Sequence, residues 1–175
     1  MSIITFWNDG TEQTGKTLAI AAIATQISIT HNYKTLIIST EYNDDILDNC
    51  FWEKNKVKKN LGLFGPNTNI ELDSGINGLI KIMRSNKITP ENVKDYTKTV
   101  FKDRLDVLQS FKGGEGYYES IKELYPEIID LANQYYDLVI VDLGKRLDEN
   151  LRKKILNKSD LIVAAIAQRL KSIER

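Results

Sequence analysis

The sequence has little of several features that would direct a chain away from an ordinary intracellular domain. Cys50 is its one cysteine, which leaves no internal disulfide framework and fits a reducing compartment. Lysine plus arginine and aspartate plus glutamate both number 24, and this balance gives no global reason to expect nucleic acid or a membrane surface as a partner. Disulfide scaffolds and strongly charged binding proteins are therefore not expected.

The sequence also lacks a long hydrophobic run. Its most apolar helical stretch, residues 18–29, is interrupted by Thr25, Gln26 and Ser28, and it is too short to span a bilayer. No basic segment followed by an apolar run is present at the N-terminus, so no signal peptide is expected. A chain of 175 residues is long enough for one domain with a substantial core. We therefore expect a single domain over residues 1–175, cytoplasmic and without a transmembrane segment.

What the sequence does contain is a glycine-bounded loop near its start. Residues 10–17 read Gly-Thr-Glu-Gln-Thr-Gly-Lys-Thr, a complete match to the Walker A pattern G-x-x-x-x-G-K-[ST]. Residues 2–7 before the loop have the composition of a buried strand, and residues 18–24 after it that of a helix. Strand, loop and helix in this order form a phosphate-binding loop, because the backbone N–H groups of the loop and the helix N-terminus surround the phosphates. The pattern predicts a nucleotide-binding site.

The residue types in this loop suggest separate roles. Lys16 is expected to reach the β- and γ-phosphates, and the Thr17 hydroxyl is expected to bind Mg²⁺. The predicted nucleotide contacts come from consecutive residues, namely Gly10, Thr11, Glu12, Gln13, Thr14, Gly15, Lys16, Thr17 and Leu18.

The rest of the chain alternates between strand-like and helix-like segments. Short apolar runs predict strands at residues 34–40, 104–109, 137–142 and 160–167, the last two as buried strands. Helical spacing or start signals predict helices at 44–61, 76–84, from 89 onward, 115–135 with a break near Pro126, and 148–157. Buried strands separated by helices indicate an α/β fold with a mostly parallel sheet covered on both faces, the three-layer P-loop NTPase architecture.

In such a sheet the ligand lies beyond the carboxyl ends of the strands. Asp142 follows four apolar residues, 138–141, which is the form of a Walker B strand. An acid at this place holds Mg²⁺ through a coordinated water while Thr17 supplies a direct ligand. The alternative is that Asp142 is a cap or turn residue after a buried strand.

The phosphate loop at the N-terminus, an acid just after the second strand, and residues 136–142 and 159–163 together resemble the ParA/MinD family of P-loop ATPases. This resemblance implies binding of ATP with Mg²⁺, a nucleotide-dependent homodimer, and a role in positioning or assembly with a protein partner whose identity stays open. It also implies catalytic roles for Lys16, Glu41 and Asp142, with Thr17 and Asp142 holding the metal.

The chain departs from the family pattern within the loop. The family's loop has an early lysine that crosses the dimer interface, and Thr11 stands in its place here. Glu12 and Gln13 replace two glycines, and Glu12 brings a negative side chain toward an anionic ligand. Without the cross-subunit cation, less charge on the transferring phosphoryl group is compensated. Slow or absent hydrolysis is expected.

A second departure concerns the acid that positions the attacking water. Of the family's two acids at the end of the second strand, only Glu41 has a counterpart as a carboxylate, although Asp44 and Asp45 lie close enough to substitute. Three functions therefore stay open: a positioning ATPase with weak turnover, a nucleotide-binding regulatory protein without turnover, and a P-loop small-molecule kinase or ligase.

Two further expectations come from the length and from the basic residues. The family continues for several elements past the fifth strand, so we expect a C-terminally short form with weaker base selectivity and dimerisation. Phe51, Trp52 and the lysines within 54–59 resemble a basic and aromatic surface for nucleic acid. A solvated lysine face on an amphipathic helix is the preferred interpretation because the net charge is zero.

Overall fold

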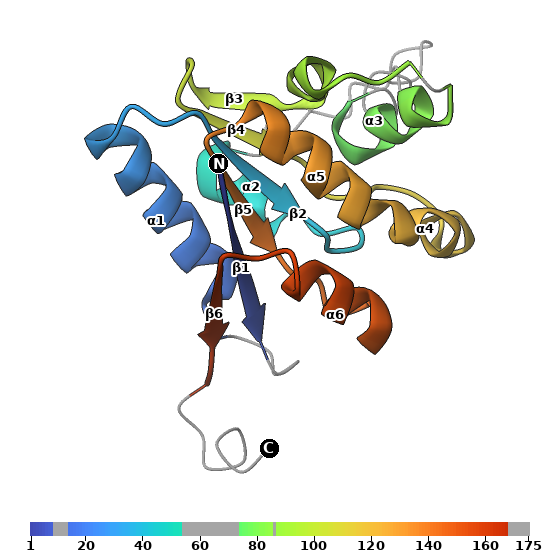
Figure 1. Cartoon of the computed structure of the whole chain (residues 1–175). Helices are drawn as coiled ribbons and strands as arrows, with labels where there is room; N and C mark the ends of the chain where they lie inside the picture. Colours follow the sequence, from blue (N-terminus) through green and yellow to red (C-terminus); the bar gives the residue numbers. More distant parts are fainter. Residues whose placement is uncertain (9–13, 54–73, 86, 168–175) are drawn as a thin grey trace, which may run out of the picture.

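The computed structural model describes residues 1–8, 14–53, 74–85 and 87–167. Within these residues the strands form one sheet in the order β3-β4-β2-β5-β1-β6 (Figure 1). Each neighbouring pair is parallel except β3 and β4, which are antiparallel. The strands are β1 (Ser2–Asn8), β2 (Thr35–Ser39), β3 (Lys98–Phe101), β4 (Leu105–Leu108), β5 (Leu138–Asp142) and β6 (Leu161–Ala165).

Helices connect the parallel strands, because parallel strands need a crossover connection between the end of one and the start of the next. They are α1 (Lys16–Thr30), α2 (Ile46–Phe51), α3 (Gly75–Arg84), the 3₁₀ turn η2 (Pro90–Tyr96), α4 (Glu115–Ile121), the 3₁₀ turn η3 (Lys122–Leu124), α5 (Tyr125–Tyr135) and α6 (Glu149–Leu156). The break predicted in the helix over residues 115–135 is η3, and Pro126 lies in the first turn of α5, where its missing N–H costs no hydrogen bond.

The helices form a layer on each face of the sheet, which confirms the predicted three-layer α/β architecture. Ile20 and Ala24 of α1 and Leu47 of α2 pack on one face, against a cluster that includes Ile37 and Ile140. Helices α3 to α6 contribute to a larger core on the opposite face (Figure 1). Because successive side chains of a strand point to opposite faces, each central strand supplies both cores.

The antiparallel edge strand β3 has no counterpart among the strands expected from the sequence. Its four residues, Lys98–Phe101, carry lysine and threonine at exposed positions and pair with β4 through a register shift near Phe101. Asp103 then turns the chain with a positive φ of 58°. A short polar edge strand leaves no strong apolar pattern, because only one of its sides is paired and little of it is buried.

The sequence predicts a buried strand over residues 160–167, and the prediction that this strand is buried is wrong. Strand β6 forms next to β1, as its residues predict, but its apolar side chains remain partly open, with Leu161 53% and Ile162 48% exposed. β6 is the last strand of the sheet in the described part of the chain, so only one of its edges is paired. Apolar composition alone does not distinguish an edge strand from a central one.

Local start signals of two helices agree with the structure. Asp148 caps α6, and its Oδ1 accepts a hydrogen bond of 2.9 Å from the backbone N–H of Leu151. Thr89 and Asn92 form a capping box before η2, where Pro90 takes the first position. These caps satisfy backbone donors that lack partners at a helix start. No helix within the described residues is both long enough and apolar enough to cross a membrane.

Candidate functional site

The second half of the Walker A loop leads directly into α1. Gly15 precedes the helix with a φ of +72°, a left-handed conformation that favours glycine. Lys16 and Thr17 form the first turn, and Leu18 follows on the helix with an exposed side chain. The predicted contacts Gly10, Thr11, Glu12 and Gln13 lie outside the described residues, so their roles stay predictions.

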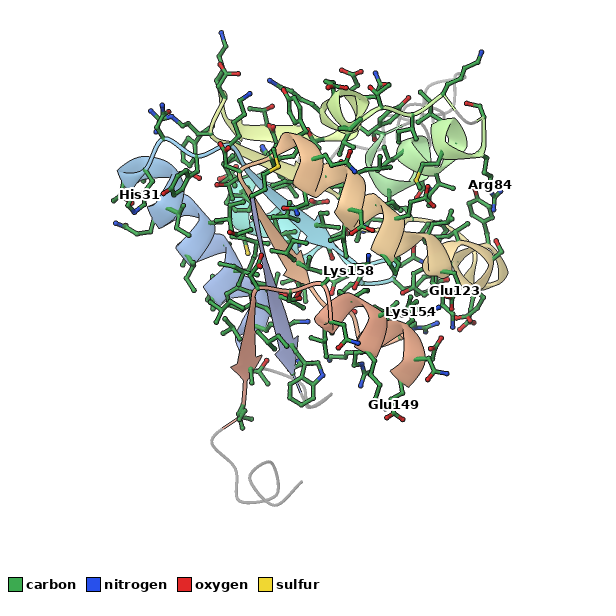
Figure 2. The ribbon with its side chains drawn as sticks, in the orientation of Figure 1. His31, Arg84, Glu123, Glu149, Lys154 and Lys158 are labelled. Carbon is green, nitrogen blue, oxygen red and sulfur yellow. The ribbon has the colours of Figure 1, made fainter. Side chains whose placement is uncertain are left out.

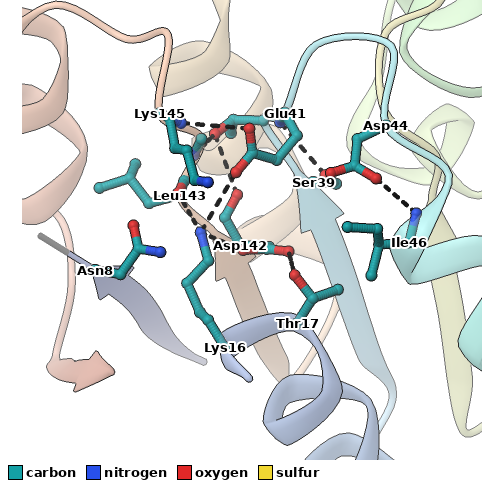
Figure 3. Close-up of polar contacts among 12 residues, drawn as sticks. Asn8, Lys16, Thr17, Ser39, Glu41, Asp44, Ile46, Asp142, Leu143 and Lys145 are labelled. Atoms are coloured by element: carbon teal, nitrogen blue, oxygen red, sulfur yellow. Dashed lines mark hydrogen bonds and ion pairs between the residues drawn. The ribbon is translucent and has the colours of Figure 1, made fainter. Parts of the chain in front are cut away.

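Lys16 occupies a buried position where three elements meet. Its Nζ lies 2.7 Å from Asp142 Oδ1 at the end of β5 and 3.6 Å from Glu41 Oε1 after β2. Nζ also donates a hydrogen bond to the Leu143 carbonyl oxygen (Figure 3). The Lys16 and Asp142 side chains are 4% and 1% exposed, so the ion pair is shielded from water. A buried charge is tolerated only when it is paired, and here each charge satisfies the other.

Asp142 also joins Lys16 to its neighbour in the helix. Thr17 Oγ1 donates a hydrogen bond of 2.9 Å to Asp142 Oδ2, so the two carboxylate oxygens face the ammonium and the hydroxyl separately. A hydroxyl and a carboxylate are hard oxygen donors of the kind that Mg²⁺ prefers. Among the described residues no group of three or more His, Cys, Asp and Glu side chains could hold a metal by itself. Mg²⁺ usually keeps several waters and takes phosphate oxygens besides one or two protein ligands.

Glu41 completes the charged cluster. Burial is the largest influence on its carboxyl and raises its pKa, the Lys16 ammonium lowers the pKa, and the Asp142 carboxylate raises it again, with a net upward shift. Glu41 Oε2 accepts a hydrogen bond of 3.3 Å from the backbone N–H of Lys145. A carboxylate with a raised pKa is suited to accept a proton from water.

The other two candidate acids, Asp44 and Asp45, have partners other than Lys16. Asp44 Oδ1 accepts a hydrogen bond of 2.6 Å from the Ile46 backbone N–H at the start of α2. Asp45 pairs with the ammonium of Lys112. Sequence could not choose among Glu41, Asp44 and Asp45, and the geometry favours Glu41 because it is the one that contacts Lys16.

The loops after β2 and β5 make a close contact that the sequence analysis did not predict. The Gly144 backbone N–H donates to Thr40 Oγ1 at 2.7 Å, and a Cβ on Gly144 would lie 2.5 Å from the Thr40 carbonyl oxygen. The Thr40 backbone N–H donates in turn to the Asp142 carbonyl oxygen at 3.0 Å. The available signal was a glycine two residues after an acid at a strand end. This contact sets the position of Glu41 relative to Asp142.

A polar cavity of about 650 Å³ opens beyond the carboxyl ends of β2 and β4. It is lined by Asn43, Asp45, Asp48, Ser74, Gly75, Asn77, Asp95, Tyr96, Thr97, Lys98, Gln109, Ser110 and Lys112. Gln109 Nε2 donates to Asp48 Oδ2 at 2.8 Å, while Asp48 Oδ1 is buried without a hydrogen bond among the described residues. The cavity lies at the same edge of the sheet as the Lys16 cluster, where α/β proteins bind ligands.

The remaining sequence candidates are accounted for more simply. Cys50 is half-buried on α2 and its thiol donates to the Ile46 carbonyl oxygen, with its pKa raised mainly by burial. His31 follows the end of α1 on the exterior of the domain (Figure 2). Its ring stacks with that of Tyr33. The lysines within residues 54–59 lie outside the described residues.

No protein-family model and no curated protein sequence matches the chain. Solved structures of ParA/MinD-type ATPases share its fold. A plasmid partition protein from Borrelia burgdorferi B31 bound to AMPPNP superimposes with a TM-score of 0.65 at 19% identity, covering 99% of this chain and 64% of the other. The septum site-determining protein MinD with Mg-ADP from Pyrococcus horikoshii gives 0.57 at 14% identity, over 99% of this chain and 60% of the other.

A kinase shares the fold as well. The kinase domain of the Escherichia coli tyrosine kinase ETK gives a TM-score of 0.64 at 17% identity, covering 99% of this chain and 59% of the other. The chain therefore shares the fold of these solved structures, and it spans 59–64% of the length of the three described above. At these identities the likeness establishes the fold, and the chemistry has to be argued from the site.

Proposed function

We propose that this chain binds ATP with Mg²⁺ and acts as a nucleotide-switched positioning or assembly ATPase of the ParA/MinD type with slow hydrolysis. The observation that carries the proposal is the convergence of Lys16 and Thr17, adjacent in the Walker A pattern, on the carboxylate of Asp142. A structural cap at the end of β5 would need neither a buried ammonium nor a hydroxyl directed at it. A phosphate and metal site needs both.

Nucleotide binding would exchange the partners of these groups. The Lys16 ammonium would leave Asp142 for the phosphate oxygens, and Thr17 and Asp142 would be the residues that hold Mg²⁺. Magnesium supplies charge neutralisation between the phosphates. Lys16 also contacts Leu143, and Gly144 contacts Thr40. Separation of the buried Lys16–Asp142 pair would therefore affect the loops that follow β5 and β2. The site could therefore alternate between two states, one in which Lys16 pairs with Asp142 and one in which Lys16 contacts the nucleotide.

Turnover is expected to be slow for a reason that lies in the loop. Glu41 would orient the attacking water and take its proton, as its raised pKa allows. Thr11 stands where the related loops have a lysine, so the transferring phosphoryl group would lack that cation. A cation of this kind contributes factors on the order of 10³ or more in phosphoryl transfer. A nucleotide-dependent homodimer and a protein partner belong to the same proposal.

Calorimetric titration of the purified chain with ATP and Mg²⁺ tests the binding site. Binding should be measurable in the wild type and lost in Lys16→Ala, with retained secondary structure by circular dichroism. Lys153→Ala is the matched control, because Lys153 lies on α6 in an exposed ion pair with Glu149. Unchanged affinity in Lys16→Ala would remove the phosphate-loop assignment.

A phosphate-release assay then separates the ATPase from a regulatory protein that binds without turnover. Slow release that is lost in Glu41→Gln supports the ATPase, and binding with no release supports the regulatory protein. Release that survives Glu41→Gln would transfer the water-positioning role to Asp44, Asp45 or another group.

The polar cavity favours a second candidate, a P-loop transferase that phosphorylates a small polar acceptor. Its volume lies within the range of small-molecule sites, and the buried Asp48 Oδ1 would accept a hydrogen bond from a hydroxyl or amine. The kinase among the similar folds is consistent with such chemistry in principle. A screen of polyols and amino acids for ATP consumption above the rate without acceptor tests this candidate. Stimulation that is lost in Asp48→Asn would favour the transferase over the ATPase.

A further inference from the structure

The charge balance of the site indicates that an additional cation is needed when nucleotide binds. Lys16 faces two carboxylates, Asp142 at 2.7 Å and Glu41 at 3.6 Å. The cluster thus carries more negative than positive charge before any phosphate arrives. Magnesium and the helix N-terminus would offset part of the phosphate charge. The terminal phosphate of ATP, which ADP lacks, would add further negative charge to this site.

Two nearby cations are already engaged. The Arg146 guanidinium lies 4.4 Å from the centre of the Tyr42 ring and forms an ion pair with Glu115 of α4. The Lys112 ammonium pairs with Asp45 and donates to the Asp44 carbonyl oxygen at 2.7 Å. Moving either cation to a phosphate would break a contact that holds its own loop.

Lys145 differs from both of these residues. Within the described part of the chain, its contact is the hydrogen bond that its backbone N–H donates to Glu41 Oε2, and its exposed ammonium forms no ion pair. Figure 3 shows its side chain turning from the loop after β5 toward the side on which Lys16 lies. The Glu41 carboxylate contacts both groups: its Oε2 accepts from the Lys145 backbone N–H, and its Oε1 lies 3.6 Å from the Lys16 ammonium.

The backbone that carries Lys145 is held firmly. Gly144 contacts Thr40 so closely that no side chain fits between them, and its N–H donates to Thr40 Oγ1. Leu143, on the other side of Gly144, is buried and accepts the hydrogen bond from Lys16. A lysine on a fixed backbone with a flexible four-carbon stem can reach a phosphate without moving the loop.

We propose that Lys145 is the cation that recognises the terminal phosphate of ATP, and so distinguishes ATP from ADP. This inference rests on the proposed function. Lys16 would contact the β- and γ-phosphates, of which ADP keeps the β-phosphate, while Lys145 would approach from the opposite loop and contact the γ-phosphate alone. It would supply, within one chain, charge that Thr11 does not provide. The backbone N–H of Lys145 donates to Glu41, the carboxylate proposed to position the water. Binding of the γ-phosphate by Lys145 would therefore also affect the position of Glu41.

Affinities for AMPPNP and ADP, measured by calorimetry in Mg²⁺, test the assignment. A charge-assisted hydrogen bond contributes about 1.5–3 kcal/mol, so Lys145→Ala should weaken AMPPNP binding by roughly tenfold to a hundredfold. ADP affinity should change by less than about twofold, since no γ-phosphate is present. Lys145→Arg should keep most of the preference for AMPPNP, because the charge is retained. The control Lys153→Ala should leave both affinities unchanged.

The outcomes separate this inference from the proposed function. An equal loss for AMPPNP and ADP in Lys145→Ala, or a loss for neither, would overturn the role of Lys145 while nucleotide binding by the wild type would stand. Absence of nucleotide binding in the folded wild type would overturn both. A melting curve of each variant without nucleotide checks that the exposed substitution leaves the fold intact.

Discussion

Replacing Lys16 by methionine tests the buried ion pair independently of any nucleotide. Methionine keeps much of the stem and removes the charge. It leaves Asp142, which is 1% exposed, next to Glu41 with no cation between the two carboxylates. The Leu143 carbonyl oxygen also loses its donor. The folded state of this variant should therefore be less stable than that of the wild type.

The magnitude is set by burial. Removing one partner of a buried ion pair costs about 3–5 kcal/mol, since it leaves the other charge uncompensated. The lower half of this range is expected, because the raised pKa of Glu41 eases its protonation and so removes one of the two charges. For a domain of this size each kcal/mol corresponds to a melting-temperature change of about 2–4 °C, so a decrease of roughly 6–16 °C follows.

Urea and thermal unfolding without nucleotide, at pH 7 and pH 5, measure the effect. The loss should be smaller at pH 5, because the pKa of Glu41 is raised by burial and would no longer be lowered by the Lys16 ammonium, so Glu41 takes up a proton as the pH falls. Lys153→Met is the control, since its pair with Glu149 is exposed and such pairs contribute about 0.3–0.5 kcal/mol.

A double variant checks that the loss comes from this pair. Lys16→Met with Asp142→Asn should lose less stability than the two single variants together, because an amide at position 142 carries no unpaired charge and can still accept the Thr17 hydroxyl. This stabilising role of Lys16 is refuted if Lys16→Met and Lys153→Met unfold at the same urea concentration. It is also refuted if Lys16→Met loses the same stability at pH 7 and at pH 5.

Three further changes have defined outcomes. Thr17→Val should weaken ATP binding much more in Mg²⁺ than in EDTA, because it removes the metal-directed hydroxyl, and equal losses in calorimetry would argue against a metal shared with Asp142. Glu41→Gln should raise the melting temperature at pH 7: burial raises the pKa of Glu41, so its contribution to stability is present below its unfolded pKa and is lost as the pH rises. That advantage should close toward acidic pH, and an advantage that widens there would contradict the shift. Gly144→Ala should reduce the free energy of unfolding by about 1–3 kcal/mol through its clash with Thr40. Gly116→Ala, a helical position with open space, should raise it by about 0.5–1 kcal/mol, and equal urea midpoints for the two variants would contradict the close contact.

Local signals in the sequence determined much of the architecture. The Walker A pattern between a strand and a helix, the apolar strand that ends at Asp142, and the cap at Asp148 all depend on residues a few positions apart. Patterns of this length report backbone geometry directly, because periodicity and capping are properties of one element. The fold class and the α/β order followed from them. The exceptions were β3, with its polar edge, and the burial of β6, since pairing on one side leaves little trace in composition.

Only the tertiary structure decided which side chains meet. Lys16, Glu41 and Asp142 come from three parts of the chain that the parallel sheet brings to one edge, where their side chains form one charged cluster. The contact between Gly144 and Thr40 depends on the spacing of the loops after β5 and β2, which no local pattern encodes. Residues a hundred positions apart are placed by the packing of the whole sheet. The sequence therefore determined the kinds of chemistry available, and the fold decided that Glu41, and not Asp44 or Asp45, faces the lysine.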